Sequence, residues 1–85
     1  MDMDELREMQ GRALKAACAT ALSDGDWQVL RHLEQKAAGI TASLSDDDFA
    51  ALAQTRQAIR AKYHTLLAQV AAAQTEDDIT AVSWD

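Results

Sequence analysis

Apolar and polar residues recur with a helical period in three stretches of the chain. The first stretch is residues 4–22, where charged side chains fall opposite the apolar ones. The second, residues 27–44, has the narrowest apolar stripe, and the third, residues 46–74, is the longest. The stripe of the second stretch is Val29, Leu30, Leu33, Ala37, Ile40 and Leu44. The third carries a coiled-coil-like seam of alternating three- and four-residue steps, Phe49, Leu52, Arg56, Ile59, Tyr63, Leu66 and Val70, which only Arg56 interrupts.

Two turn signals separate these stretches. Residues 23–26 read Ser-Asp-Gly-Asp, where Gly25 is suited to end one helix and Asp26 to cap the next. Ser45 with Asp48 three residues later is typical of a helix start. Three helical stretches and no strand pattern predict an all-α fold. Because the connections are short, neighbouring helices are expected to run antiparallel. We expect an antiparallel up-down-up three-helix bundle with a long third helix.

The C-terminal tail, residues 75–85, begins with another capping signature, Thr75 followed by acidic residues. It is therefore expected to be a short helix or a flexible end. With only 85 residues, the chain is expected to form a single domain, residues 1–85. The absence of proline and the presence of only three glycines permit long helices throughout.

The charge and the cysteine content narrow the class of protein. A net charge of −6 argues against nucleic-acid binding, which needs clustered Lys and Arg. No apolar run is long enough for a membrane span, and the acidic N-terminus lacks the features of a signal peptide. The one cysteine excludes an internal disulfide, so a cytoplasmic location is expected.

Residues that carry chemistry are few. His32 and His64 fall on different predicted helices, and Cys18 has no assignable base. The acidic run 46–48 is explained by helix capping and by the helix dipole, because adjacent helical residues point in different directions. We therefore expect no catalytic residue, no metal and no cofactor, and the protein is predicted not to be an enzyme.

Apolar residues beyond the reach of the second helix are the first candidates for partner binding. Leu66, Leu67 and Val70 lie in the expected overhang, where they form a groove for an amphipathic helix unless the first helix or the tail covers them. Trp27 is expected to pack over the end of a neighbouring helix or to anchor a partner. Trp84 is expected to dock on the bundle, contact a partner or stay mobile.

The order of these features resembles the FliT family of flagellar export chaperones. The resemblance covers residues 6–74 and is carried by Gly25-Asp26-Trp27, the following Val29, Leu30, Leu33 and Glu34, and a long helix with Ile59, Tyr63, Leu66, Leu67 and Val70. It implies a helical bundle of the bacterial cytoplasm that covers a C-terminal helical segment of the filament-cap protein before type III export. It also implies contacts with the export ATPase and export gate and, in some members, with the flagellar master transcription regulator.

The family's C-terminal helix folds over its binding surface, and Ile79, Val82 and Trp84 would form a reduced version of that cover. This chain and its tail are shorter than the family pattern. The expected function is thus a protein-binding export chaperone. Its expected partner-binding residues are Tyr63, Leu66, Leu67, Val70, Trp27, Ile79, Val82 and Trp84. The alternatives are a self-associating structural or adaptor protein, such as a phage component that forms a homodimer, and an acidic regulator of a transcription factor.

Overall fold

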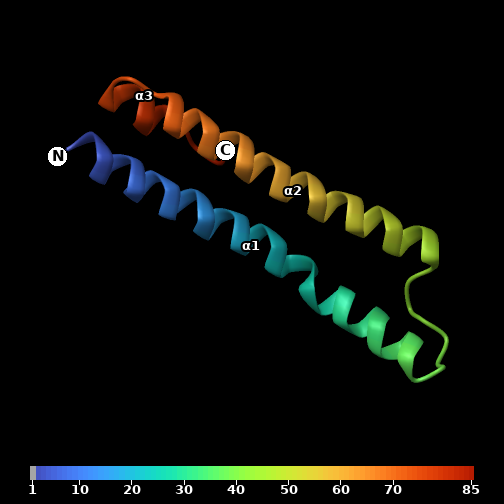
Figure 1. The fold of residues 1–85 in the computed structure, drawn as a ribbon. Helices are drawn as coiled ribbons and strands as arrows, with labels where there is room; N and C mark the ends of the chain where they lie inside the picture. Colours follow the sequence, from blue (N-terminus) through green and yellow to red (C-terminus); the bar gives the residue numbers. More distant parts are fainter. Residues whose placement is uncertain (1) are drawn as a thin grey trace.

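The computed structural model describes residues 2–85 and contains three α-helices. They are α1 (Met3–Ala37), α2 (Asp46–Ala72) and α3 (Glu76–Ala81). Figure 1 shows α1 and α2 side by side and antiparallel, with α3 folded back at the end of the hairpin that holds the N-terminus. The molecule is a rod of 55 × 18 × 16 Å. The all-α prediction is confirmed for residues 2–85, but a helical hairpin with a short third helix replaces the expected three-helix bundle.

The predicted break at residues 23–26 is wrong, because α1 continues through it. Glycine inside a helix costs only about 1 kcal/mol relative to alanine, which packing against a neighbour can offset. Here α2 supplies that packing, since Arg56 donates hydrogen bonds to the Leu22 carbonyl (2.7 Å) and to the Asp26 carboxylate (2.7 Å). Asp26 therefore pairs with α2 and caps nothing. The α1 ribbon bends near this point (Figure 1), as expected where a side chain binds a helix carbonyl.

Helix α1 ends at Ala37 and not near residue 44, because Gly39 adopts a left-handed conformation with φ of 70°. The Gly39 N–H bonds the Lys36 carbonyl (3.2 Å), and the Ile40 N–H bonds the Gln35 carbonyl (2.9 Å). This pair of bonds is the Schellman motif, which satisfies the last carbonyls of a helix. Ile40 and Leu44, the last two residues of the predicted 27–44 stripe, consequently lie in a connection, residues 38–45, between α1 and α2.

Helix α2 confirms the predicted start. The Ser45 hydroxyl accepts a hydrogen bond from the Asp48 N–H (3.0 Å), and the helix ends at Ala72, two residues before the predicted 74. Every seam residue from Phe49 to Val70 is buried or half-buried. The seam therefore faces α1, as a three- and four-residue alternation requires.

Apart from Leu14, the residues of α1 that face this seam are small or polar. They recur at heptad spacing as Gly11, Leu14, Cys18, Ala21, Gly25, Gln28 and His32, and all are buried or half-buried. A Cβ added to Gly25 would lie 3.3 Å from a Leu52 methyl carbon, so the glycine allows α2 to approach closely. Large side chains of α2 thus pack into spaces left by small ones of α1.

The core lies where all three helices meet. Its buried members are Leu14, Val70, Ala73 and Ile79. Thr75 caps α3 by accepting a hydrogen bond from the Asp78 N–H (3.1 Å), which confirms the short-helix alternative for the tail.

Candidate protein-binding site

The groove predicted on the C-terminal half of α2 is closed by the chain itself. Val70 is 4% exposed and Ile79 is 0% exposed, so both are core residues. Tyr63, Leu66 and Leu67 pack half-buried against the same cluster, together with Val82 and Trp84. The expectation of an open groove at these residues is therefore wrong. The alternative holds, in which α1 and the tail cover them.

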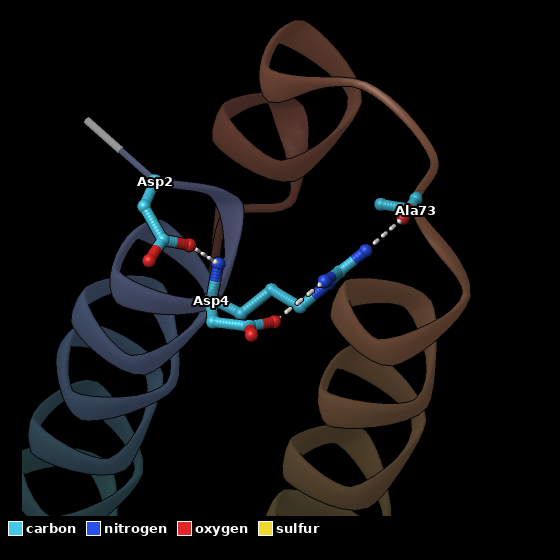
Figure 2. A network of polar contacts seen from close by, with 4 residues as sticks. Asp2, Asp4 and Ala73 are labelled. Carbon is cyan, nitrogen blue, oxygen red and sulfur yellow. Dashed lines mark hydrogen bonds and ion pairs between the residues drawn. The ribbon is translucent and has the colours of Figure 1, made fainter.

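Polar contacts hold this cover in place. The Arg7 guanidinium donates a hydrogen bond to the Ala73 carbonyl (2.8 Å) and pairs with Asp4 (3.1 Å), whose N–H is bonded by the Asp2 carboxylate (Figure 2). The Gln10 amide of α1 donates to the Val82 carbonyl beyond α3. Both contacts join α1 to the segment that follows α2, so they hold residues 73–82 against the N-terminal half of α1.

Trp84 docks on the hairpin instead of extending into solvent. It is half-buried against the core cluster, and the Lys62 ammonium lies 4.4 Å from the centre of its ring. A cation over an indole face is an attractive contact. Of the three arrangements considered for Trp84, the structure shows the docked one.

The opposite end of the hairpin leaves large apolar side chains exposed. Trp27, Leu30, Leu33 and Ile40 are 56%, 59%, 53% and 61% exposed, and these four residues are named the distal face. Leu30 follows Trp27 by three residues and precedes Leu33 by three, so the helical members are neighbours on the α1 surface. Ile40 follows in the connection. The stripe expected to be core in the second predicted helix is thus largely on the surface.

Polar residues occupy the inner side of α1 at this end. Gln28 lines a hollow with Leu52 of α2, and the His32 ring stacks on Phe49 of α2 with ring centres 4.0 Å apart. Gln35 is half-buried beside the connection. The Nδ1 atom of His32 is buried without a hydrogen-bond partner in the described residues. This part of α1 is therefore inverted relative to an ordinary surface helix, which turns polar residues to water and apolar residues to the core.

Trp27 belongs to two features at once. It is part of the distal face, and it also borders a shallow pocket together with Gln28, Arg31, His32, Gln35, Ser43 and Leu44. The structure therefore contradicts the packing of Trp27 over a neighbouring helix end. Its indole is instead 56% exposed.

The connection beside the distal face is fixed by side-chain bonds. The Gln35 amide bonds Ser43 twice, as acceptor from its N–H (2.8 Å) and as donor to its hydroxyl (3.1 Å). Lys36 forms an ion pair with Asp46 (3.0 Å), and the hydrogen bond and charge of that ammonium lower the pKa of the Asp46 carboxyl. These bonds tie the connection, residues 38–45, to the last turn of α1 and the first turn of α2.

No cluster of three or more His, Cys, Asp or Glu side chains with metal-binding geometry occurs within residues 2–85. Cys18 is buried between the helices. No helix in this range has the length and apolarity needed to cross a membrane.

Sequence reasoning placed Leu30, Leu33 and Ile40 in the core and missed them as a surface. One available signal was Gly39 directly after Lys36, a typical helix end that would have taken Ile40 out of the helix. Comparison of the chain with protein-family models, curated proteins and solved structures finds no match.

Proposed function

We propose that this protein is a protein-binding helical hairpin whose binding site is the distal face, the exposed row of Trp27, Leu30, Leu33 and Ile40. The inversion of α1 at this end is the observation that supports the proposal. The side toward α2 carries polar residues, so the leucines contribute nothing to the core and are left for another chain. Contiguous exposed apolar residues of this kind mark interaction sites.

The side chains of the distal face indicate what kind of partner it binds. A short helical row with an exposed tryptophan buries apolar surface without needing a cofactor, and it suits the apolar side of another helix. Arg31 and Glu34 lie beside the leucines and are exposed, so they supply a charged rim. An apolar centre with a charged rim is the usual arrangement of a protein interface.

Site-directed photocrosslinking in the native cell tests this function. A photoreactive amino acid at Leu33 should form adducts with an apolar helical surface, mapped by mass spectrometry. The same amino acid at Met9, which is 47% exposed on α1 but outside the distal face, should form few. Equal yields from the two positions, or none from either, would overturn the proposal.

An export chaperone is the second candidate function, favoured by the position of α3 over the predicted groove. In this version Ile79, Val82 and Trp84 act as a displaceable cover, and an amphipathic export-substrate helix replaces them on Leu66, Leu67 and Val70. Ile79→Ser should release α3 while circular dichroism still reports the two long helices. An amphipathic helical peptide that binds the variant and the wild type equally, or neither, would exclude this mechanism.

A further inference from the structure

We infer that the occupant of the distal face is a second copy of this chain, bound antiparallel about a two-fold axis between Leu30 and Leu33. The inference rests on the proposed function, because it names the partner of the same site. It is carried by three observations: the surface area of the single chain, the arrangement of the leucines, and the charges beside them.

The single chain exposes more surface than a compact protein of its size. Its accessible area is 5810 Å² for a mass of 9.3 kDa. A compact monomer of that mass exposes about 5,000 Å². The excess of about 800 Å², spread over the rod, is of the same order as the area that one partner contributes to a standard interface. The radius of gyration, 17.4 Å, also exceeds the roughly 12 Å of a compact 85-residue domain.

The leucines of the distal face are self-complementary. In an antiparallel pair of α1 helices with its axis midway between Leu30 and Leu33, Leu30 of each copy lies opposite Leu33 of the other. Each contact is then made twice, which is the property of an isologous interface. Trp27 lies one turn before Leu30, so the two indoles close the two ends of the shared apolar strip.

The charges fit the same arrangement. Arg31 and Glu34 are exposed, and neither forms an ion pair within residues 2–85. Both lie on one flank of the leucines, at neighbouring positions of the α1 surface. An antiparallel copy brings like flanks together, so Arg31 of one chain meets Glu34 of the other, and the reverse. Opposite charges meet on both sides of the axis, which favours this register over a parallel one.

Sedimentation of the full chain over a wide concentration range tests the inference. A reversible monomer–dimer equilibrium is expected in the micromolar range, because interfaces of this size lose part of their gross energy to the entropy of association. Leu33→Asp should abolish the dimer, whereas Met9→Asp, on the same helix but outside the face, should leave it unchanged. Far-ultraviolet circular dichroism of dilute samples checks that both variants keep their helices.

Charge exchange tests the antiparallel register directly. Arg31→Glu and Glu34→Arg should each weaken self-association, since each variant places like charges opposite one another. A mixture of the two variants should associate again, because the mixed pair restores both attractive contacts. A mixture that stays monomeric while the wild type dimerises would overturn the proposed register.

A fluorescence measurement gives an independent signal. In a Trp84→Phe background Trp27 is the remaining tryptophan, and its emission should shift to shorter wavelength as the chain dimerises. A wild-type chain that remains monomeric at several hundred micromolar would overturn the inference. The proposed function would survive that result if position 33 still crosslinks to a different protein, and it would fall if no crosslink forms.

Discussion

Replacement of Leu14 by alanine should remove a large part of the hairpin's stability. Leu14 is 2% exposed and packs in the cluster of Val70, Ala73 and Ile79, where α1, α2 and α3 meet. Truncation of a buried leucine to alanine costs about 3 kcal/mol, from the lost transfer energy and the cavity that remains. A chain of 85 residues has a total stability on the order of 4–13 kcal/mol. A hairpin with so few buried apolar residues belongs at the lower end, so the loss is about half or more.

Urea denaturation followed by circular dichroism measures this change. With a slope of about 1 kcal/mol per molar urea for a small protein, the midpoint should fall by about 3 M, or the variant should be largely unfolded without urea. Leu30→Ala is the matched control, since it makes the same chemical change on the same helix at a 59% exposed position. At low micromolar concentration it should cost less than about 0.5 kcal/mol. Equal losses from Leu14→Ala and Leu30→Ala would refute the assignment of core and surface on α1.

Three further changes have defined outcomes. Gly11→Ala should raise the free energy of unfolding by about 0.5–1 kcal/mol, because the added Cβ would lie at an ordinary 3.7 Å from an α2 side chain. Gly25→Ala should raise it by less, because there the added Cβ would lie at a tight 3.3 Å. Equal effects in urea titrations would contradict the close approach at Gly25. Asp46→Asn should flatten the fall in stability as the pH drops below about 5: Lys36 lowers the pKa of the folded carboxyl, so its contribution is present above the usual aspartate pKa and lost as the pH falls through the folded pKa. An unchanged pH profile would show that the pair contributes nothing. His32→Phe should keep the ring stack and remove the buried nitrogen that has no partner. The free energy of unfolding should rise by about 1 kcal/mol, and the thermal midpoint should rise with it. A lowered midpoint would show that the nitrogen is satisfied in solution.

The seam of α2 was predictable because its inward residues are large. Phe49, Leu52, Ile59 and Tyr63 repeat with a clear period, and Arg56 interrupts that period because it pairs with Asp26 across the hairpin. The helix start at Ser45 was equally predictable, since a hydroxyl followed by acidic residues acts locally. Local chemistry and large side chains leave a readable pattern in one sequence.

The inner side of α1 was not predictable by hydrophobic periodicity. From Ala21 to His32 its inward residues are alanine, glycine and polar side chains, so they form no apolar stripe, while the outward Leu30 and Leu33 do. The stripe of residues 27–44 therefore pointed to the wrong side of the helix. The prediction of a turn at residues 23–26 is wrong for a related reason. Its glycine serves close packing with Leu52, and only the tertiary structure shows this.

The exposed apolar surface lies at the opposite end of the hairpin from the predicted groove, for the same physical reason. Leu66, Leu67 and Val70 are covered because the first half of α1 packs on them through Leu6 and Leu14 and because α3 closes over the same cluster. The distal face then became the exposed apolar surface. The expected break at residues 23–26 thus reverses both expectations: Leu30 and Leu33 are exposed, and Val70 is buried.

The burial of Cys18 against the α2 seam makes its thiol a reporter of the hairpin. A disulfide reagent in solution reaches the sulfur only when α1 and α2 separate. The rate of modification under native conditions thus measures the free energy of that opening without added denaturant. Substitutions near either end of the rod can be ranked by this rate, which distinguishes fraying of one end from separation along the whole length.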